Sequence, residues 1–334
     1  MEVAAVVNLH ARRGSEAVGR KVRAALPGAR VRVTRSLDDV RRFIDDELGR
    51  DPPELLLSGG GDGTAVALLN ALRTCGVAFP SLGVLPLGTG NGLARVTGAP
   101  RIDEALARIA ALDGRRAPTR RFALVEGEGA IAPFLGTGWD AEIVSDFKAQ
   151  LDKAPPGMRR LHSGLYGYLN GMFTRTIPRH VFGGGPANVV LTNLGDDAYV
   201  VDPAGHVVPL ANSPKGTVLY RGPASVAAAA ATEEWGFGFR AFPFAHAMPG
   251  RVSVRCYGAG VIEATRNMFR LWRGEHPMPK MHDFLLTAGR MEFDREVPFQ
   301  IGGDVAGMRR AFEFRLATDA VDLVDWGRLR SASA

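Results

Sequence analysis

The first third of the chain alternates short apolar runs with longer segments whose apolar residues recur at helical spacing. The apolar runs predict strands at 3–9, 31–34, 55–57 and 82–87, and the segments between and after them predict helices at 14–25, 36–48, 65–74 and 102–112. Ser36 precedes two acidic residues, as expected for a residue that caps a helix N-terminus. This alternation predicts a parallel sheet covered by helices on both faces.

From about residue 118 the pattern changes to short β-rich runs punctuated by glycine and proline. These runs lie at 121–126, 187–192, 252–257, 284–293, 298–301 and 311–316. The segment 159–174 instead has apolar residues at helical spacing, which fits a helix packed on the sheet or a wall for an apolar substrate. We therefore predict an α/β domain at 1–118, which the segment 310–334 would complete, and a β-rich, sandwich-like substrate domain at 119–309.

No apolar run reaches the roughly 18 residues that a membrane-spanning helix needs. The first apolar run follows Met1 almost directly and lacks the leading positive charge and cleavage site of a secretory signal. Two cysteines, Cys75 and Cys256, are too few for a disulfide framework and favour a reducing compartment. We expect a soluble, cytoplasmic protein that touches a membrane surface only transiently.

The chain is basic, with 41 Lys and Arg against 35 Asp and Glu and a net charge of +6. This balance favours anionic partners such as nucleotides, acidic lipid surfaces or nucleic acid. Because the arginines are scattered rather than clustered, a general Arg-rich composition explains the charge equally well. No nucleic-acid partner is predicted.

A glycine-rich turn follows the predicted strand at 55–57 and has the sequence SGGGDGT at residues 58–64. Glycines allow a tight turn in which bare N–H groups approach phosphate oxygens, and the following helix points its positive end to the same place. Asp62 stands where a carboxylate holds Mg²⁺ or accepts a hydroxyl proton, and both roles stay open. Thr64 is placed to bond a phosphate oxygen or to cap the helix.

A second glycine-rich turn follows the next predicted strand and has the sequence PLGTGNGLAR at residues 86–95. In a parallel sheet both turns leave the carboxyl ends of strands, where ligands bind in open α/β folds. Neither turn contains the Gly-Lys-Ser/Thr of a Walker loop, and the first strand–helix turn lacks the Gly-x-Gly-x-x-Gly fingerprint. The pair predicts a phosphate-binding edge of a different type.

Together the two turns resemble the catalytic fold of the diacylglycerol kinases and sphingosine kinases, especially the bacterial soluble lipid kinases. The resemblance continues at Asn8 near the end of the first strand and at Thr34 after the second. It extends to the segments 136–141 (GTGWDA) and 299–304 (FQIGGD), the latter resembling the family's Asp-Gly-Glu segment. The resemblance implies an α/β nucleotide domain, a β-sandwich domain, and ATP bound in the cleft between them.

The resemblance also implies ATP and Mg²⁺ as cofactors and assigns roles to individual residues. It makes Asp62 and Asp304 the catalytic candidates, with Asp62 also the metal ligand through ATP, and Asp140 the contact to the substrate hydroxyl. It assigns ATP binding to Asn8, Thr34, Gly60, Gly61, Asp62, Gly63, Thr64, Thr89, Gly90 and Asn91.

The sequence departs from the family pattern in three places. Gly92 stands where the family usually has Asp, and Gly302 replaces the first acid of the Asp-Gly-Glu segment. Asp304 is shorter than the family's Glu by roughly 1.5 Å, one carbon–carbon bond. The segment 246–251 has no carboxylate, so the structural metal of bacterial members is not expected. A turn role for Asp304 and a structural hydrogen bond for Asp140 remain alternatives.

We predict an ATP-dependent lipid kinase that phosphorylates the hydroxyl of a diacylglycerol- or sphingoid-type lipid. A kinase of a soluble hydroxyl compound is one alternative, since NAD kinases share the GGDGT turn. A nucleotide- or lipid-binding sensor without turnover is another, which the lost acids at 92 and 302 favour. The sequence identifies neither the lipid nor the oligomeric state, so a homodimer stays open.

Overall fold

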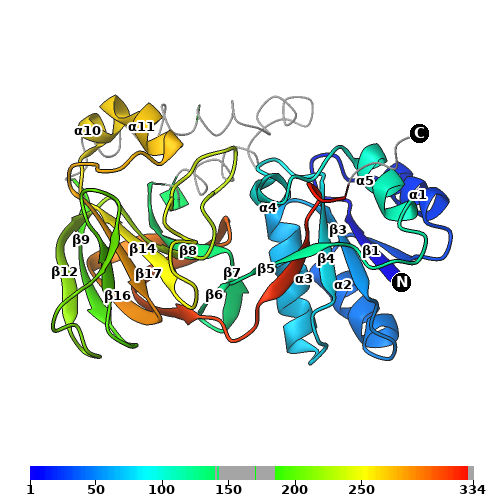
Figure 1. Ribbon diagram of the computed structural model, residues 1–334, viewed down its shortest axis with the longest axis horizontal. Coiled ribbons are helices and arrows are strands. Elements are labelled where there is room, and N and C mark those ends of the chain that lie inside the picture. The colour runs from blue at the N-terminus through cyan, green and yellow to red at the C-terminus, as the bar shows by residue number, and fades with distance from the viewer. Residues whose placement is uncertain (140, 143–169, 171–184, 330–334) are drawn as a thin grey trace. The chain divides into compact units, whose positions relative to one another are not determined.

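The computed structural model describes residues 1–139, 141–142, 170 and 185–329 (Figure 1). The chain divides into two compact units, one of Met1–Phe122 with Ala320–Ala334 and the other of Ala123–Asp319. Asp140 and nearly all of the predicted helical segment at 159–174 lie outside the described residues. In the part of the chain that is described, no helix is long and apolar enough to cross a membrane.

The first unit is built on a six-stranded sheet with the order β2-β1-β3-β4-β18-β5. Its strands are β1 (Val3–Asn8), β2 (Arg30–Thr34), β3 (Leu55–Gly60), β4 (Ser81–Pro86), β5 (Thr119–Phe122) and β18 (Val321–Val324). All neighbouring pairs are parallel except β18 and β5, which are antiparallel. The predicted parallel sheet is confirmed, and a strand from near the end of the chain lies inside it.

Helices follow the strands of this unit and cover both faces of its sheet. They are α1 (Glu16–Ala25), α2 (Leu37–Phe43) with the π-helical turn η1 (Ile44–Leu48), α3 (Asp62–Thr74), α4 (Gly92–Val96) and α5 (Ile102–Ala110). Ser36 caps α2 as predicted, since its side chain accepts a hydrogen bond from the Asp39 N–H. Alternate strand residues such as Ala5, Val7 and Leu57 pack against α1 and α5 in one buried cluster.

The second unit contains a mostly antiparallel sheet of twelve strands, as the change of pattern after residue 118 predicts. They are β6 (Val125–Gly127), β7 (Ala130–Ala132), β8 (Phe134–Gly138), β9 (Ala187–Asn193), β10 (Tyr199–Val201), β11 (Val207–Pro209), β12 (Val218–Ala224), β13 (Val226–Ala230), β14 (Val252–Tyr257), β15 (Met281–Leu286), β16 (Ala288–Ile301) and β17 (Asp304–Leu316). Two short helices, α10 (Val261–Arg266) and α11 (Met268–Arg273), lie between β14 and β15.

Several elements differ from those predicted, and each difference has a local reason. The predicted strand at 284–293 is two strands, because Thr287 separates β15 from the long β16. The alanine-rich strand β13 was not predicted, and it lies between β8 and β14, where small side chains fit close to their neighbours. The glycines Gly59 and Gly60 continue β3, so the first glycine-rich turn is shorter than the sequence indicates.

Candidate active site

The strand order of the α/β unit creates a switch point at the carboxyl ends of β1 and β3. The chain leaves β1 toward β2 on one side and leaves β3 toward β4 on the other, so the loops after β1 and β3 diverge. In open α/β folds this divergence opens the crevice in which ligands bind. Asn8, Thr34, Gly60 and Pro86 end the four adjacent strands at this edge.

A side-chain hydrogen bond spans the switch point. Asn8 Nδ2 donates to Thr64 Oγ1 at 2.9 Å, which joins the end of β1 to the first turn of α3. Asn8 Oδ1 accepts a bond from the His10 N–H at 2.9 Å, so the amide is held at both ends. Two residues that the sequence assigns to nucleotide binding are therefore brought together directly.

The first glycine-rich turn packs tightly onto its own helix. Gly60 is the buried last residue of β3, and a Cβ there would collide with the Thr64 side chain. Gly61 stands at the N-cap position of α3 with extended backbone and no side-chain cap. Asp62 is thus the first residue of a helix rather than a loop residue, and the N-terminal N–H groups of α3 face a site without a protein side-chain cap.

The two glycine-rich turns touch one another. The N–H groups of Leu87 and Gly88 both donate to the Gly60 carbonyl, at 3.0 and 2.9 Å. A Cβ on Gly88 would lie 2.9 Å from the Gly61 nitrogen and closer still to its Cα. Only glycine at position 88 allows this approach of the two backbones, since a Cβ carried by any other residue would collide.

Asp62 links the two turns through its carboxylate. Its oxygens accept hydrogen bonds from the Gly92 and Leu93 N–H groups, each at 2.8 Å, at the start of α4. Burial raises the pKa of the Asp62 carboxyl above its ordinary value, and these two N–H groups act in the opposite direction. Asp62 therefore caps the neighbouring helix, a role that sequence reasoning missed because it depends on where α4 lies in space.

The second turn is held by its own asparagine. Asn91 adopts a left-handed backbone conformation with φ of 52°, which asparagine tolerates better than most residues. Its side chain accepts from the Gly88 N–H and donates to the Gly88 carbonyl, both at 3.0 Å. Asn91 thus shapes the turn, which is a different task from direct contact with a nucleotide.

The remaining groups of this edge fit an anionic ligand. Within the described residues, the N–H groups of Gly63, Thr89 and Gly90 have no protein acceptor. Backbone donors at glycine-rich turns and a helix N-terminus suit phosphate oxygens. Thr34 at the end of β2 is only 2% exposed, so this candidate is buried at the edge of the sheet.

In the β unit, Asp304 is the exposed first residue of β17. It pairs with Ile301 across a two-residue turn formed by Gly302 and Gly303, with φ of 58° and 87°. Positive φ at both positions is the requirement of a type I′ hairpin turn, which glycine meets without strain. Glycine at position 302 therefore has a conformational reason that is separate from the loss of an acid.

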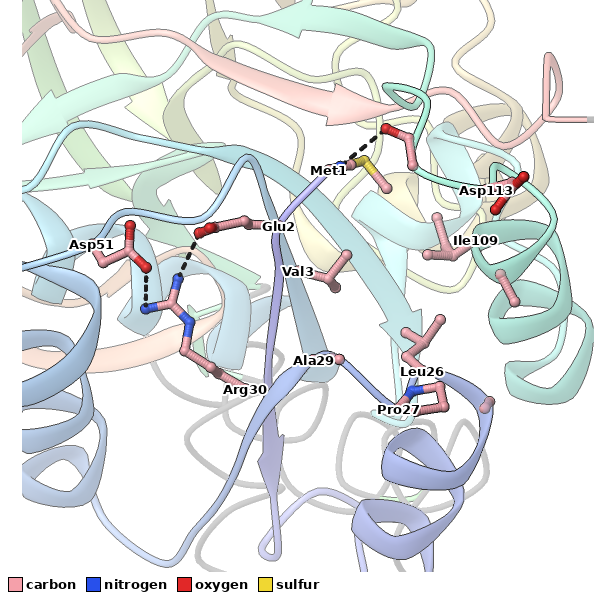
Figure 2. Close-up of a pocket in the computed structure, with 14 residues that line it drawn as sticks. Met1, Glu2, Val3, Leu26, Pro27, Ala29, Arg30, Asp51, Ile109 and Asp113 are labelled. Atoms are coloured by element: carbon pink, nitrogen blue, oxygen red, sulfur yellow. Dashed lines mark hydrogen bonds and ion pairs between the residues drawn. The ribbon is translucent and has the colours of Figure 1, made fainter.

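A cavity of about 580 Å³ lies at the opposite edge of the α/β sheet (Figure 2). Its wall includes Glu2 and Val3 before and at the start of β1, Arg30 at the start of β2, and Asp51. Arg30 forms ion pairs of 3.6 Å with both Glu2 and Asp51. Because it lies at the amino ends of the strands, this cavity is away from the edge where such folds bind ligands.

Known proteins share parts of this architecture. Residues 3–121 match the family model of the diacylglycerol kinase catalytic domain. The chain is 33% identical over 160 residues to a Pseudomonas fluorescens protein named probable lipid kinase YegS-like, a match that covers 46% of this chain and 51% of the relative. A Klebsiella pneumoniae protein of the same name is 36% identical over 135 residues, or 40% of this chain and 44% of the relative. The chain spans about half the length of the curated relatives it matches.

Solved structures match over almost the whole chain. A Bacillus anthracis diacylglycerol kinase superposes with a TM-score of 0.63 at 16% identity, covering 97% of this chain and 96% of that one. An Archaeoglobus fulgidus NAD kinase in complex with ATP has a TM-score of 0.50 at 11% identity, covering 99% and 100%. These likenesses show the fold alone. The family match at residues 3–121 supports the resemblance carried by the glycine-rich turns, and it relates this part of the chain to the diacylglycerol kinase catalytic domain.

Proposed function

We propose that the protein transfers the γ-phosphoryl group of ATP to the hydroxyl of a diacylglycerol- or sphingoid-type lipid. The observation that carries this proposal is the junction of two glycine-rich turns through Asp62 at the switch point of the α/β sheet. The names of the YegS-like relatives and the family match support a lipid kinase.

The phosphates of ATP would be held by backbone groups of the two turns. Gly63, Thr89 and Gly90 supply N–H donors that are not used within the described protein. Asn8 and Thr64 supply side-chain groups at the switch point. Gly60, Gly61 and Asn91 keep the two backbones close, and Thr34 supports the edge from beneath.

The Asp62 carboxylate is the group that would hold Mg²⁺. Each of its oxygens accepts one N–H bond, and a carboxylate oxygen has a second lone pair that a hard cation can use. When bound, Mg²⁺ would offset the charge of the β- and γ-phosphates. Asp62 would then serve twice, as a helix cap and as a metal ligand.

Asp304 is the proposed general base. Its carboxylate is exposed and follows the two-residue turn of a hairpin, which suits a group that must meet an incoming hydroxyl. It would accept the hydroxyl proton while the lipid oxygen attacks the γ-phosphorus and ADP leaves. Asp140 is proposed to orient the same hydroxyl. The protein contributes positioning and charge neutralisation, since this reaction needs little covalent help.

A second candidate function is nucleotide binding without turnover. One observation favours it: Gly92, where the family usually has Asp, begins α4 directly beside Asp62, so the second turn brings no further carboxylate to this place. Such a protein would bind Mg·ATP and label no acceptor.

The deciding experiment measures transfer of labelled γ-phosphate from Mg·ATP to diacylglycerol, monoacylglycerol, ceramide and a sphingoid base in mixed micelles. Wild type is compared with Asp62→Ala and Asp304→Ala, and ATP binding is measured by calorimetry alongside. We expect one lipid class to be labelled by wild type and by neither variant. ATP binding without labelling of any lipid or soluble alcohol would favour the second candidate instead.

A further inference from the structure

Two apolar side chains stand out on the surface of the β unit. Phe269 on α11 is 78% exposed and Ile262 on α10 is 60% exposed, the highest values for large apolar residues in the described part of the chain. Both lie on the short helical segment between β14 and β15 (Figure 1). Exposed single apolar residues are common, but two on one short segment require a physical explanation.

The segment is firmly anchored from its other side. Ala264 and Leu271 are buried in a cluster with Tyr257 and Met278. Trp272 stacks on Phe239 with ring centroids 5.4 Å apart, and its carbonyl accepts the Arg240 N–H at 3.0 Å. The exposure of Phe269 and Ile262 is therefore not a consequence of poor packing, because other apolar side chains of the same helices are fully packed.

Each exposed apolar residue shares a side of its helix with an arginine. Ile262 and Arg266 are four residues apart on α10, and Phe269 and Arg273 are four residues apart on α11. Asn267, with φ of −98° and ψ of 10°, separates the two helices. We call these four residues the docking face.

The docking face is positively charged. Residues 261–280 contain four basic and two acidic side chains. Arg270 and Arg273 share the single carboxylate of Glu275, at 3.0 and 3.3 Å. Arg266 is exposed and has no acidic partner among the residues that the structure describes. The combination is thus two apolar side chains surrounded by an excess of guanidinium groups.

We propose that the docking face binds the surface of an anionic lipid bilayer. Apolar side chains that enter the headgroup boundary beside basic side chains that attract acidic lipids are the features of interfacial helices. A second copy of the chain fits less well, since stable protein interfaces bury roughly 800 Å² per partner and two side chains expose far less. The inference rests on the proposed function, because a lipid kinase must meet an acceptor that lies in a bilayer.

The test measures co-sedimentation with phosphatidylcholine vesicles that contain or lack phosphatidylglycerol, in the absence of ATP. We expect wild type to bind the anionic vesicles, and high salt to weaken this binding. Ile262→Ser/Phe269→Ser should lower vesicle affinity at least about tenfold, as expected for two lost apolar side chains. The matched control is Leu37→Ser/Val218→Ser, which removes two other exposed apolar residues and should bind like wild type.

A second pair of variants tests the charge. Arg266→Glu should weaken binding about fivefold or more, whereas Arg221→Glu makes the same change of net charge on the exposed β12 and should have little effect. Equal binding by docking-face variants and their controls overturns the proposal. A docking-face variant whose oligomeric state differs from that of wild type in the absence of lipid also overturns the proposal, because this result would assign the face to contact with a second copy.

Vesicle binding and phosphoryl transfer are independent measurements, so either can fail without the other. If vesicle binding depends on the docking face but no lipid is phosphorylated, the docking face is supported and the proposed kinase activity is not. Transfer in detergent micelles without such binding supports the kinase and overturns the surface.

Discussion

The two units present their candidate acids in contrasting surroundings. In the α/β unit, Asp62 is half-buried, and each of its carboxylate oxygens accepts a hydrogen bond from an N–H group of a neighbouring helix. In the β unit, Asp304 is exposed beside a two-glycine turn. The contrast teaches that one acid is part of the architecture of its site, while the other is presented by a hairpin whose turn is made by glycine alone. We therefore expect a substitution of Asp304 to change activity without changing stability, whereas a substitution of Asp62 should change both.

The largest expected effect belongs to Asp304. Asp304→Ala should reduce phosphoryl transfer by about 100- to 10,000-fold, because it removes the proposed base. It should change the free energy of unfolding by less than about 0.5 kcal/mol, since the side chain is exposed. Asp197→Ala, an exposed acid of the same unit, serves as the control for both measurements. Full activity of Asp304→Ala would remove this residue from the mechanism.

Gly88→Ala tests the contact between the two glycine-rich turns. The added Cβ would push the turns apart near Gly61, and a displacement of this size should lower transfer about 100-fold. Gly28→Ala is the matched control, because a Cβ at that position meets nothing within 4 Å. ATP affinity measured by calorimetry should fall in parallel for Gly88→Ala alone. Equal affinities for the two variants would show that the close approach is not needed.

Asp62→Asn tests the architectural role of the first acid. The amide oxygen of asparagine can accept a hydrogen bond from one of the two N–H groups, but its NH₂ group would face the other N–H, and two donors cannot bond. The variant should therefore lose about 1–3 kcal/mol of stability. Urea unfolding measures this loss, and Asp304→Asn provides the exposed counterpart. A stable Asp62→Asn variant without activity would assign Asp62 to chemistry only.

The smallest effect concerns the bond between Asn8 and Thr64. A double-mutant cycle with Asn8→Ala and Thr64→Val should give a coupling energy of about 0.5–1.5 kcal/mol in unfolding free energy. The same cycle in ATP binding shows whether the pair acts as a unit toward the nucleotide. Additive losses in both measurements would mean that the two side chains act independently.

Much of the candidate site at the carboxyl edge of the α/β sheet could be predicted because its signals are local. The strand before each turn, the glycines and the helix after each turn are consecutive in the sequence, so a parallel sheet brings Asn8, Gly60 and Asn91 to one edge. The Ser36 cap is equally local.

The rest depended on contacts between distant segments. Nothing in the sequence around Asp62 indicates that its carboxylate bonds Gly92 and Leu93, because the position of α4 is set by packing. The helices α10 and α11 were not predicted, since six-residue helices carry too few turns for a periodic signal. The Gly302–Gly303 turn resembled an acidic motif that had lost an acid. The sequence alone does not show that the positive φ angles at these two positions give a separate, conformational reason for glycine.

The strand β18 has a consequence for how the protein is made. It lies between β4 and β5, and the following Trp326 is fully buried among residues of the α/β unit. A ribosome therefore releases the first 122 residues long before the strand that separates β4 from β5 exists. The sheet of the α/β unit therefore lacks β18 while about 200 intervening residues are synthesised at roughly 5–20 residues per second. The β unit is an insertion that can finish folding first, and the α/β unit is completed last.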